Sequence, residues 1–302
     1  MLAFISRVQK IANPPSSAVQ PKEKTALKFG CLDAANIVPG ALVIPAKSHP
    51  DAKAYGGAIG YQDMINDPEV DVIYNPLPNG LHFEWTMKAL KGGKHVLLEK
   101  PAANTEDEAR QIFTLAEKKG LVVLEASYYR FPSIQRVKAI LDSKELGPTK
   151  TITAALSAPE GTSKPDDIRW KYELGGGSMM DPGSYTVNVL NYLASPNKPK
   201  SVLTASAEPY SSATEHKQID KNYFWNDSSF PKLKATVRCE GGSIEIFNFL
   251  MPHYYHYITV SPKGKRSRTE KAYKFGDGSK GEDWCISLST GGITRSPRNS
   301  TT

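Results

Sequence analysis

The 302-residue sequence contains few cysteines and no long apolar segment. The three cysteines, Cys31, Cys239 and Cys285, are odd in number and lie far apart, which is typical of a protein from a reducing compartment. This spacing predicts neither a disulfide framework nor a metal site. No apolar run approaches the roughly 20 residues that a membrane-spanning helix requires. We therefore expect a cytoplasmic protein that has no metal centre and no membrane partner.

The sequence also lacks a strong charge of one sign. Lys and Arg number 38 against 31 Asp and Glu, which gives a formal charge of +7. This excess fits either a solvated basic surface or a site for an anionic cofactor such as NADP. No basic run is interleaved with aromatic residues, so we do not expect nucleic acid as a partner.

A complete dinucleotide-binding fingerprint is missing as well. The first predicted strand, Leu27 to Leu32, leads into GCLDAANI, and only Gly30 fits the pattern G-x-G-x-x-G. Asp33 stands where a glycine is expected, and a carboxylate beside a pyrophosphate is unfavourable by charge. The interval between Ser48 and Tyr61 contains no β-branched run, so the second strand of a Rossmann half is predicted to be absent. The sequence alone therefore does not distinguish NADP from NAD.

The most regular part of the sequence is a predicted strand–helix–strand unit between Asp71 and Pro101. Apolar strands are predicted at Val70 to Tyr74 and at His95 to Leu98, and the residues between them have helical spacing. Such a unit belongs to a parallel sheet, in which ligands bind beyond the carboxyl ends of the strands. The Asn75-Pro76 turn and Glu99-Lys100-Pro101 both fall at those ends.

Three motifs together resemble one protein family. They are Asn75-Pro76 followed by His82, then Glu99-Lys100-Pro101, and GGGSMMDPGSY from Gly175 to Tyr185. This combination is similar to the Gfo/Idh/MocA oxidoreductases, and within them to the branch of fungal NADP-dependent D-xylose dehydrogenases and dimeric dihydrodiol dehydrogenases. Residues 34–37 also match that branch.

The resemblance implies an α/β fold with two domains. Residues 25–147 are expected to form a Rossmann-type parallel-sheet domain without its second strand. Residues 148–284 are expected to form an α+β domain with a mainly antiparallel sheet, through which the chain would form a homodimer. Consecutive strands without intervening helices support the second assignment. They are predicted at Thr149 to Ser157, Ser201 to Glu208, Lys232 to Cys239, Gly242 to Phe249 and His256 to Ser261.

The two ends of the chain depart from this pattern. Residues 1–24 carry Leu2, Ile5, Val8 and Ile11 at helical spacing with no acidic residue before Glu23. This segment is either an arm that packs on the body of the protein or a mitochondrial presequence. Residues 285–302 are rich in Ser, Thr and Gly and are expected to be a disordered tail.

Three residues are candidates for catalysis. Lys100 lies at the mouth of the predicted sheet, while Asp181 and Tyr185 are four residues apart at the start of a helix and share a face. From the residues alone, Lys100 could be an ordinary surface lysine, Asp181 a helix cap and Tyr185 a core residue. The resemblance instead implies that Tyr185 is the acid/base, Lys100 tunes it and binds substrate, and Asp181 orients the substrate. A tyrosine hydroxyl, with a pKa of about 10 in isolation, needs such a cationic neighbour.

The resemblance also implies a set of cofactor contacts for NADP, or for NAD. Arg169 and Trp170 could equally serve in packing between the domains, and His82 is expected on the cofactor side rather than as a base. The full set is Gly30, Leu32, Ala34, Asn36, Ile37, Pro76, Leu77, Asn79, His82, Glu99, Lys100, Arg169 and Trp170.

Three functions remain open at this stage. The family resemblance implies hydride transfer from the anomeric carbon of a sugar such as D-xylose to NADP, which gives a lactone. An aromatic trans-diol is the alternative substrate. A non-catalytic binding or scaffold protein is the third reading, favoured by Asp33, the missing strand and the unusual tail.

Overall fold

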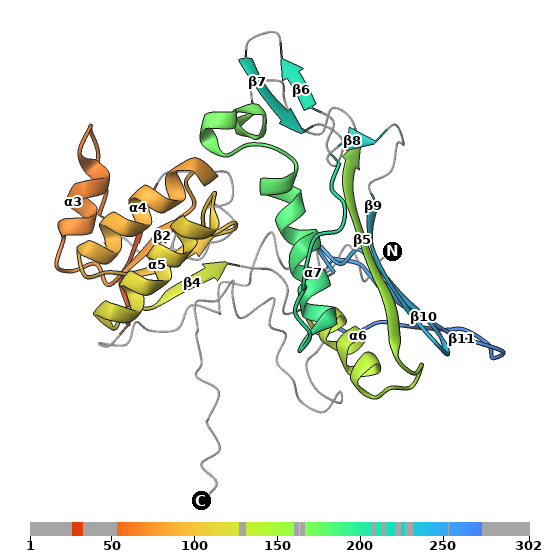
Figure 1. The fold of residues 1–302 in the computed structure, drawn as a ribbon. Coiled ribbons are helices and arrows are strands. Elements are labelled where there is room, and N and C mark those ends of the chain that lie inside the picture. The colour runs from red at the N-terminus through yellow and green to blue at the C-terminus, as the bar shows by residue number, and fades with distance from the viewer. Residues whose placement is uncertain are drawn as a thin grey trace, which may run out of the picture.

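The computed structural model describes residues 26–32, 53–126, 131–159, 163, 167–206, 209–212, 215–220, 225–226, 232–252 and 254–273. These residues form two lobes, one built on a parallel sheet and one on a largely antiparallel sheet, with helix α7 between them (Figure 1). The predictions for Asp33, Ala34, Asn36 and Ile37, for the arm at 1–24 and for the tail at 285–302 lie outside the described residues.

The first lobe contains a four-stranded parallel sheet in the order β1-β2-β3-β4. The strands are β1 (Phe29–Cys31), β2 (Val72–Asn75), β3 (His95–Glu99) and β4 (Val123–Ala126). All four residues of β2 are buried, as its apolar sequence predicts for a central strand. Within the described residues, β1 pairs only with β2 and forms an edge of the sheet. No strand occurs in the described part of the predicted gap, residues 53–59.

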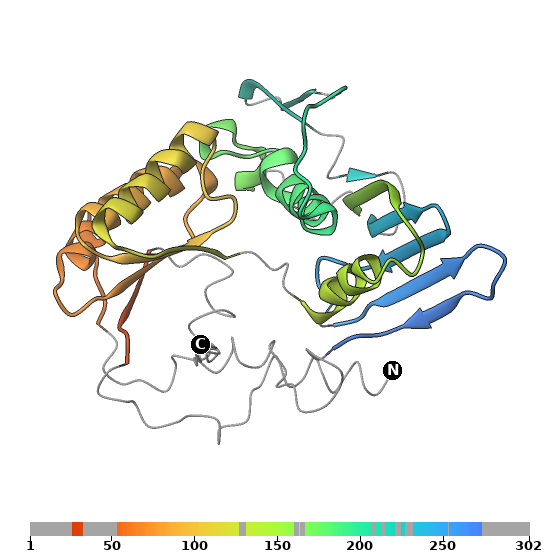
Figure 2. The same ribbon diagram turned by 60° about the horizontal axis from the view of Figure 1, so that its bottom comes forward.

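The described residues of this lobe form helices α3 (Gly60–Asn66), α4 (Asn79–Lys91) and α5 (Glu106–Lys119). Figure 2 shows α4 and α5 together on one face of the sheet. The sequence predicts a capping box of Thr105 and Glu108 at the start of α5 and an end at Gly120. The Thr105 side chain accepts a hydrogen bond from the Glu108 backbone amide, and Gly120 ends the helix in the left-handed conformation. The Glu108 carboxylate, however, accepts from the Asn104 amide rather than from that of Thr105. The core between helices and sheet includes Ile73, Leu98 and Ile112, each fully buried.

The second lobe contains a six-stranded sheet in the order β12-β11-β10-β9-β5-β8. Every pairing is antiparallel except that of β5 with β8. Its strands are β5 (Thr149–Pro159), β8 (Trp225–Asn226), β9 (Lys232–Cys239), β10 (Gly242–Phe247), β11 (Tyr257–Pro262) and β12 (Arg268–Glu270). A separate hairpin pairs β6 (Pro209–Ser212) with β7 (Glu215–Asp220).

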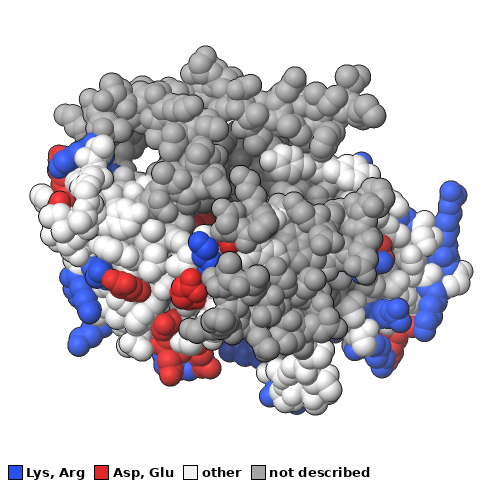
Figure 3. Space-filling view, turned by 90° about the horizontal axis from the view of Figure 1, so that it is seen from above, with Lys and Arg blue, Asp and Glu red and all other residues white. Residues whose placement is uncertain are grey.

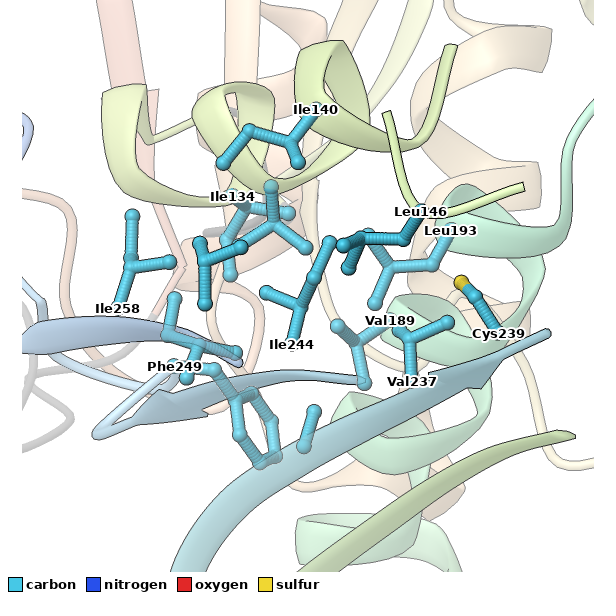
Figure 4. Close-up of a cluster of buried hydrophobic side chains, with 14 of the residues drawn as sticks. Ile134, Ile140, Leu146, Val189, Leu193, Val237, Cys239, Ile244, Phe249 and Ile258 are labelled. Carbon is cyan, nitrogen blue, oxygen red and sulfur yellow. The ribbon is translucent and has the colours of Figure 1, made fainter. Parts of the chain in front are cut away.

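Helices α6 (Pro132–Asp142) and α7 (Ser184–Ala194) pack on this sheet, and Figure 4 shows the apolar side chains between them. Ile134 and Ile140 of α6, Val189 of α7 and Ile244 of β10 are among these buried residues. Helix α6 therefore shares its core with the second lobe.

Two details of the predicted fold are wrong. The predicted strand at Ser201 to Glu208 is irregular over its described residues 201–206, where Val202 and Leu203 are 83% and 90% exposed. The apolar residues of this segment therefore have no buried face that would support a strand. Phe113, assigned to the buried face of α5, is 44% exposed, whereas Ile112 beside it is fully buried.

Candidate active site

The turn that follows β2 is held by a buried polar network. Asn75 is completely buried, and its Nδ2 donates to the backbone oxygen of His82 at 3.2 Å and to Oγ1 of Thr86 at 3.1 Å. Its Oδ1 accepts from the backbone amide of Leu77 at 3.3 Å. These bonds tie the turn to α4, so the carboxyl end of β2 has a fixed shape.

The carboxyl ends of β2 and β3 are joined by a side-chain pair. Tyr74 Oη donates to Glu99 Oε1 at 2.7 Å across the two strands. Burial raises the pKa of Glu99, against the hydrogen bond from Tyr74 and the charge of Lys100, which both act to lower it. The hydrogen bond from Tyr74 thus fixes the Glu99 side chain at the end of β3, next to Lys100 in the sequence.

The predicted site residues Lys100 and Asp181 meet across the two lobes. Lys100 Nζ lies 2.5 Å from Asp181 Oδ1, and the two side chains are 14% and 20% exposed. The other oxygen of Asp181, Oδ2, accepts from Nε of Arg169 at 2.6 Å. One carboxylate thus bridges two cations, one from the loop after β3 and one from the short helix η4 (Ile168–Trp170).

The charges of this cluster stabilise one another. Burial alone would raise the pKa of Asp181, but the positive charges of Lys100 and Arg169 outweigh it and lower that pKa. Burial likewise opposes the charge of Arg169, whose pKa is nevertheless raised by the two aspartates that it contacts. Asp181 is therefore a carboxylate at neutral pH.

Tyr185 stands in the first turn of α7, directly after the π-helical turn η6 (Met179–Gly183) that carries Asp181. The Lys100 ammonium lies 4.5 Å from the centroid of the Tyr185 ring, which is a cation–π distance. The ring itself packs against the core of the second lobe. The structure therefore brings Lys100, Asp181 and Tyr185 into one cluster.

The glycines before Asp181 allow contact between the lobes. A Cβ on Gly175 would lie 2.8 Å from Cβ of Asn79 and 2.9 Å from the backbone nitrogen of Gly80. A Cβ on Gly80 would in turn lie 2.6 Å from the backbone oxygen of Glu173, and Asn79 Nδ2 donates to the Gly175 oxygen at 3.0 Å. In the described structure, the close approach at Gly175 thus serves a contact between the two lobes of the same chain. The run of glycines before Asp181 predicts close approach of the backbone to a ligand. At Gly175 the close neighbours are instead Asn79 and Gly80 of the first lobe.

Several predicted cofactor residues are buried. Pro76 and Leu77 form the buried turn after β2, and Leu32 has no exposed surface. Gly30 packs under α3, where a Cβ would lie 2.7 Å from Sδ of Met64. Pro76, Leu77 and Asn79 follow β2, and Glu99 and Lys100 lie at the end of the adjacent strand β3. Gly30 and Leu32 belong to strand β1 and its end.

His82 is 1% exposed, and both of its ring nitrogens face backbone oxygens. Nδ1 lies 2.7 Å from the Pro101 oxygen, and Nε2 lies 2.7 Å from the Leu77 oxygen. Sequence reasoning placed His82 on the cofactor side. The structure places it between the two turns that border that side.

An open groove of about 610 Å³ runs along α7 beside this cluster. One side is formed by Pro101, next to Lys100, and the other by residues that flank Asp181 and follow Tyr185. The groove combines apolar side chains with three small polar ones, and no charged residue lines its described part. The lining residues are Pro101, Met179, Met180, Ser184, Val187, Asn188, Asn191 and Tyr192.

Sequence reasoning missed one charged member of the cluster. Asp167 contacts Arg169 Nη1 through both carboxylate oxygens, at 3.0 and 3.1 Å, and its Oδ1 also accepts from the Arg169 backbone amide at 3.0 Å. Its position two residues before Arg169 was the only available signal. Trp170 follows Arg169 in η4 and is half-buried.

The rest of the described structure shows no sign of a metal centre or a membrane-spanning helix. Among the described residues, no cluster of His, Cys, Asp and Glu is placed to hold a metal, and none of the helices there has the length and apolarity needed to span a bilayer. Figure 3 shows Lys and Arg mixed with Asp and Glu on the described part of one face. The basic run at Lys263, Lys265 and Arg266 is an exposed tip between β11 and β12, as the sequence predicts.

The parallel sheet, the charged cluster at its carboxyl edge and the second-lobe helix that completes this cluster define a two-domain protein of the Rossmann type. Comparison with family models then identifies the family. The NAD-binding Rossmann fold of the Gfo/Idh/MocA oxidoreductases matches residues 16–127, and the C-terminal domain of the same family matches residues 134–244. The chain belongs to the Gfo/Idh/MocA oxidoreductase family.

Individual relatives differ in what they act on. The chain is 37% identical to a D-xylose 1-dehydrogenase (NADP(+)) from Haloferax volcanii over 60% of this chain and 53% of that protein. It is 34% identical to a trans-1,2-dihydrobenzene-1,2-diol dehydrogenase from Xenopus laevis over 52% of this chain and 46% of that protein. The chain thus spans about half the length of these curated relatives.

Solved structures support the fold. A 3-ketoreductase from Actinomadura kijaniata, in complex with NADP and TDP-benzene, superposes with a TM-score of 0.63 at 20% identity, covering 88% of this chain and 95% of that one. At this identity the likeness carries the fold alone.

Proposed function

We propose that this protein is an NADP-dependent oxidoreductase acting on a CH–OH group, with an aldose of the D-xylose type as substrate and a lactone as product. The observation that carries the proposal is the convergence of Lys100, Asp181 and Tyr185 at the carboxyl edge of the parallel sheet, where ligands of such sheets bind. Two of the three come from one lobe and one from the other, so the cluster lies where the two lobes meet.

The residues divide the chemistry in a simple way. NADP, when bound, supplies the hydride acceptor. Tyr185 takes the proton from the substrate hydroxyl as the carbon is oxidised, and the Lys100 ammonium beside its ring favours the phenolate that accepts this proton. Asp181 holds Lys100 in place and would orient the substrate beside it.

The residues at the sheet edge fit the nicotinamide half of a dinucleotide. The turn at Pro76 and Leu77, the Glu99 carboxyl and the Lys100 ammonium lie at the ends of adjacent parallel strands, where a Rossmann fold binds its cofactor. Asn79 and His82 fix the shape of that edge. Arg169 and Trp170 would border it from the second lobe. The pyrophosphate would be held by Gly30 and Leu32 together with residues 34–37. NADP is favoured over NAD by the branch of the family and by the basic charge of the chain.

The groove along α7 supports an uncharged substrate. A nucleotide–sugar substrate carries a diphosphate, and phosphate recognition normally uses Arg or Lys. None of the described groove residues is charged, whereas Ser184, Asn188 and Asn191 offer hydrogen bonds and the methionines offer apolar contact. This mixture suits a sugar ring, which has hydroxyl groups at its edge and apolar faces.

The same groove also fits a second class of substrate. Met179, Met180 and Val187 would also accept the ring of an aromatic trans-diol. A third candidate is a family member with impaired catalysis that acts as a binding or scaffold protein. The observation in its favour is that β1, the strand that should lie inside the sheet, is an edge in the described structure.

A cytoplasmic homodimer is part of the proposal. The face of the antiparallel sheet away from α6 and α7 would form the interface, because Phe247 and Tyr257 stack there with centroids 5.0 Å apart and Tyr255 beside them is 43% exposed.

The proposal is tested with the full chain by two measurements. A nicotinamide fluorescence titration should give micromolar affinity for NADPH, and D-xylose should then reduce NADP at an unchanged rate after chelation of metals. Turnover only with an aromatic trans-diol would select the second substrate. Absence of both binding and turnover would reject the enzyme and leave the scaffold protein.

A further inference from the structure

His82 is a buried ring clamped between two turns. It stands in the first turns of α4, and its nitrogens reach the Leu77 oxygen after β2 and the Pro101 oxygen after β3, both at 2.7 Å. These two turns end adjacent parallel strands and border the proposed cofactor edge. In this position His82 is too buried to contact a substrate, but it contacts the main chain of both turns that border the site.

The chemistry of this contact is unusual because both partners are acceptors. A neutral imidazole has one N–H and can donate to one carbonyl only, so the other carbonyl would face a lone pair. An imidazolium donates to both. Burial is the largest influence and, with the neighbouring charge of Lys100, lowers the pKa of His82, although the two carbonyls act to raise it, so the ring is neutral and each of its two tautomers donates to one carbonyl. The other groups around the ring, Asn75 and Thr86, are uncharged.

Each carbonyl belongs to a different part of the proposed site. Pro101 directly follows Lys100, so a bond to its oxygen fixes the main chain that carries the ammonium. Leu77 lies in the turn expected to run beside the cofactor, and Asn75 holds its amide from the other side. One ring thus contacts the lysine loop with Nδ1 and the cofactor turn with Nε2.

The geometry points to His82 as a positioning residue whose two nitrogens have separate tasks: Nδ1 sets the place of Lys100, and Nε2 sets the cofactor turn. This assignment rests on the proposed function for the meaning of the two tasks, but the two contacts can be tested without activity.

Two substitutions separate the tasks. The amide nitrogen of asparagine can occupy the place of Nδ1, and that of glutamine the place of Nε2, so each retains one donor. His82→Asn should keep the turnover rate and raise KM for NADP by about tenfold, the effect of one lost hydrogen bond. His82→Gln should keep KM for NADP and lower kcat by about tenfold. Equal effects of the two variants on kcat and KM would overturn the assignment, because loss of packing alone does not distinguish them.

Hydrogen–deuterium exchange provides the readout that needs no activity. In the full chain, His82→Gln should speed exchange in the peptide that contains Lys100 and Ala102, and His82→Asn in the peptide that contains Leu77. Thr86→Val is the matched control, since Thr86 is equally buried and bonds Asn75 but contacts neither carbonyl. It should lower the melting temperature without the split. If both His82 variants speed exchange equally in both peptides, the assignment is wrong even where the enzyme is active. If each variant speeds exchange in its own peptide but the chain is inactive, only the proposed function fails.

Discussion

Replacing Asp181 by asparagine removes the one negative charge that two cations share. Lys100 and Asp181 are 14% and 20% exposed, so their attraction is partly shielded from water. Two unit charges about 4 Å apart at an effective dielectric constant of about 20 attract by roughly 4 kcal/mol, from which desolvation must be subtracted. Arg169 is 42% exposed, and its pairing adds less than about 1 kcal/mol. Since asparagine keeps one acceptor, we expect Asp181→Asn to cost about 2–3 kcal/mol.

The assay is a thermal melt combined with turnover. A loss of this size should lower Tm by roughly 5–10 °C and should also reduce kcat strongly, because Lys100 loses the partner that holds it beside Tyr185. The pKa of Asp181 is lowered in the folded state, so its stabilisation is present above the unfolded pKa of about 3.9 and is lost as pH falls through the folded value. The Tm difference between parent and variant should therefore shrink below about pH 4.

Asp67→Asn is a matched control for this substitution. Asp67 also accepts from a lysine, Lys53 at 2.5 Å, and from Tyr55 at 2.6 Å, but it lies before β2 and away from the cluster. This control should lower Tm and leave kcat unchanged. An Asp181→Asn protein with parental Tm at neutral pH and parental kcat would refute the reasoning about the shared carboxylate.

Three further predictions concern single residues. Tyr185→Phe should lower kcat by roughly 10²-fold with NADP affinity unchanged, and a normal rate would place the base elsewhere. Glu99→Gln should raise Tm at neutral pH. The pKa of Glu99 is raised in the folded state, so the ionised carboxylate costs stability as the pH rises through that pKa, and an uncharged amide avoids this cost. A lower Tm of the variant at pH 7 would contradict this direction. Gly80→Ala should separate the lobes and lower both Tm and kcat, since its Cβ would meet a backbone oxygen 2.6 Å away, whereas Gly56→Ala, with open space around it, should do neither.

The sequence predicted those parts of the fold that are encoded by neighbouring residues. Strands β2 and β3 follow from short apolar runs, and α5 follows from Thr105 and Gly120 at its ends. Residues 201–206 show the limit of such reasoning, because a short apolar run forms a strand only where a partner strand and a buried face exist. The strands β6, β7 and β8 were missed for the related reason that short polar strands carry no clear pattern.

The candidate site was predictable as a set of residues but not as an arrangement. Lys100 and Asp181 are 81 positions apart, so only the fold shows that they share a hydrogen bond. The motif containing His82 was visible in the sequence, but its two carbonyl partners depend on the relative position of two loops. The glycines before Asp181 suggested room for a ligand, yet at Gly175 that room is filled by Asn79 and Gly80.

The central claim is that the cluster of Lys100, Asp181 and Tyr185 carries out hydride transfer with NADP. The most direct measurement follows nicotinamide absorbance in a mixture of the full chain, NADP and D-xylose, with Tyr185→Phe run in parallel. We expect steady reduction of NADP by the parent chain and a rate at least about 10²-fold lower for the variant, with equal NADPH binding by both. No reduction with any aldose or diol, in a chain that melts cooperatively and binds NADPH, would contradict it.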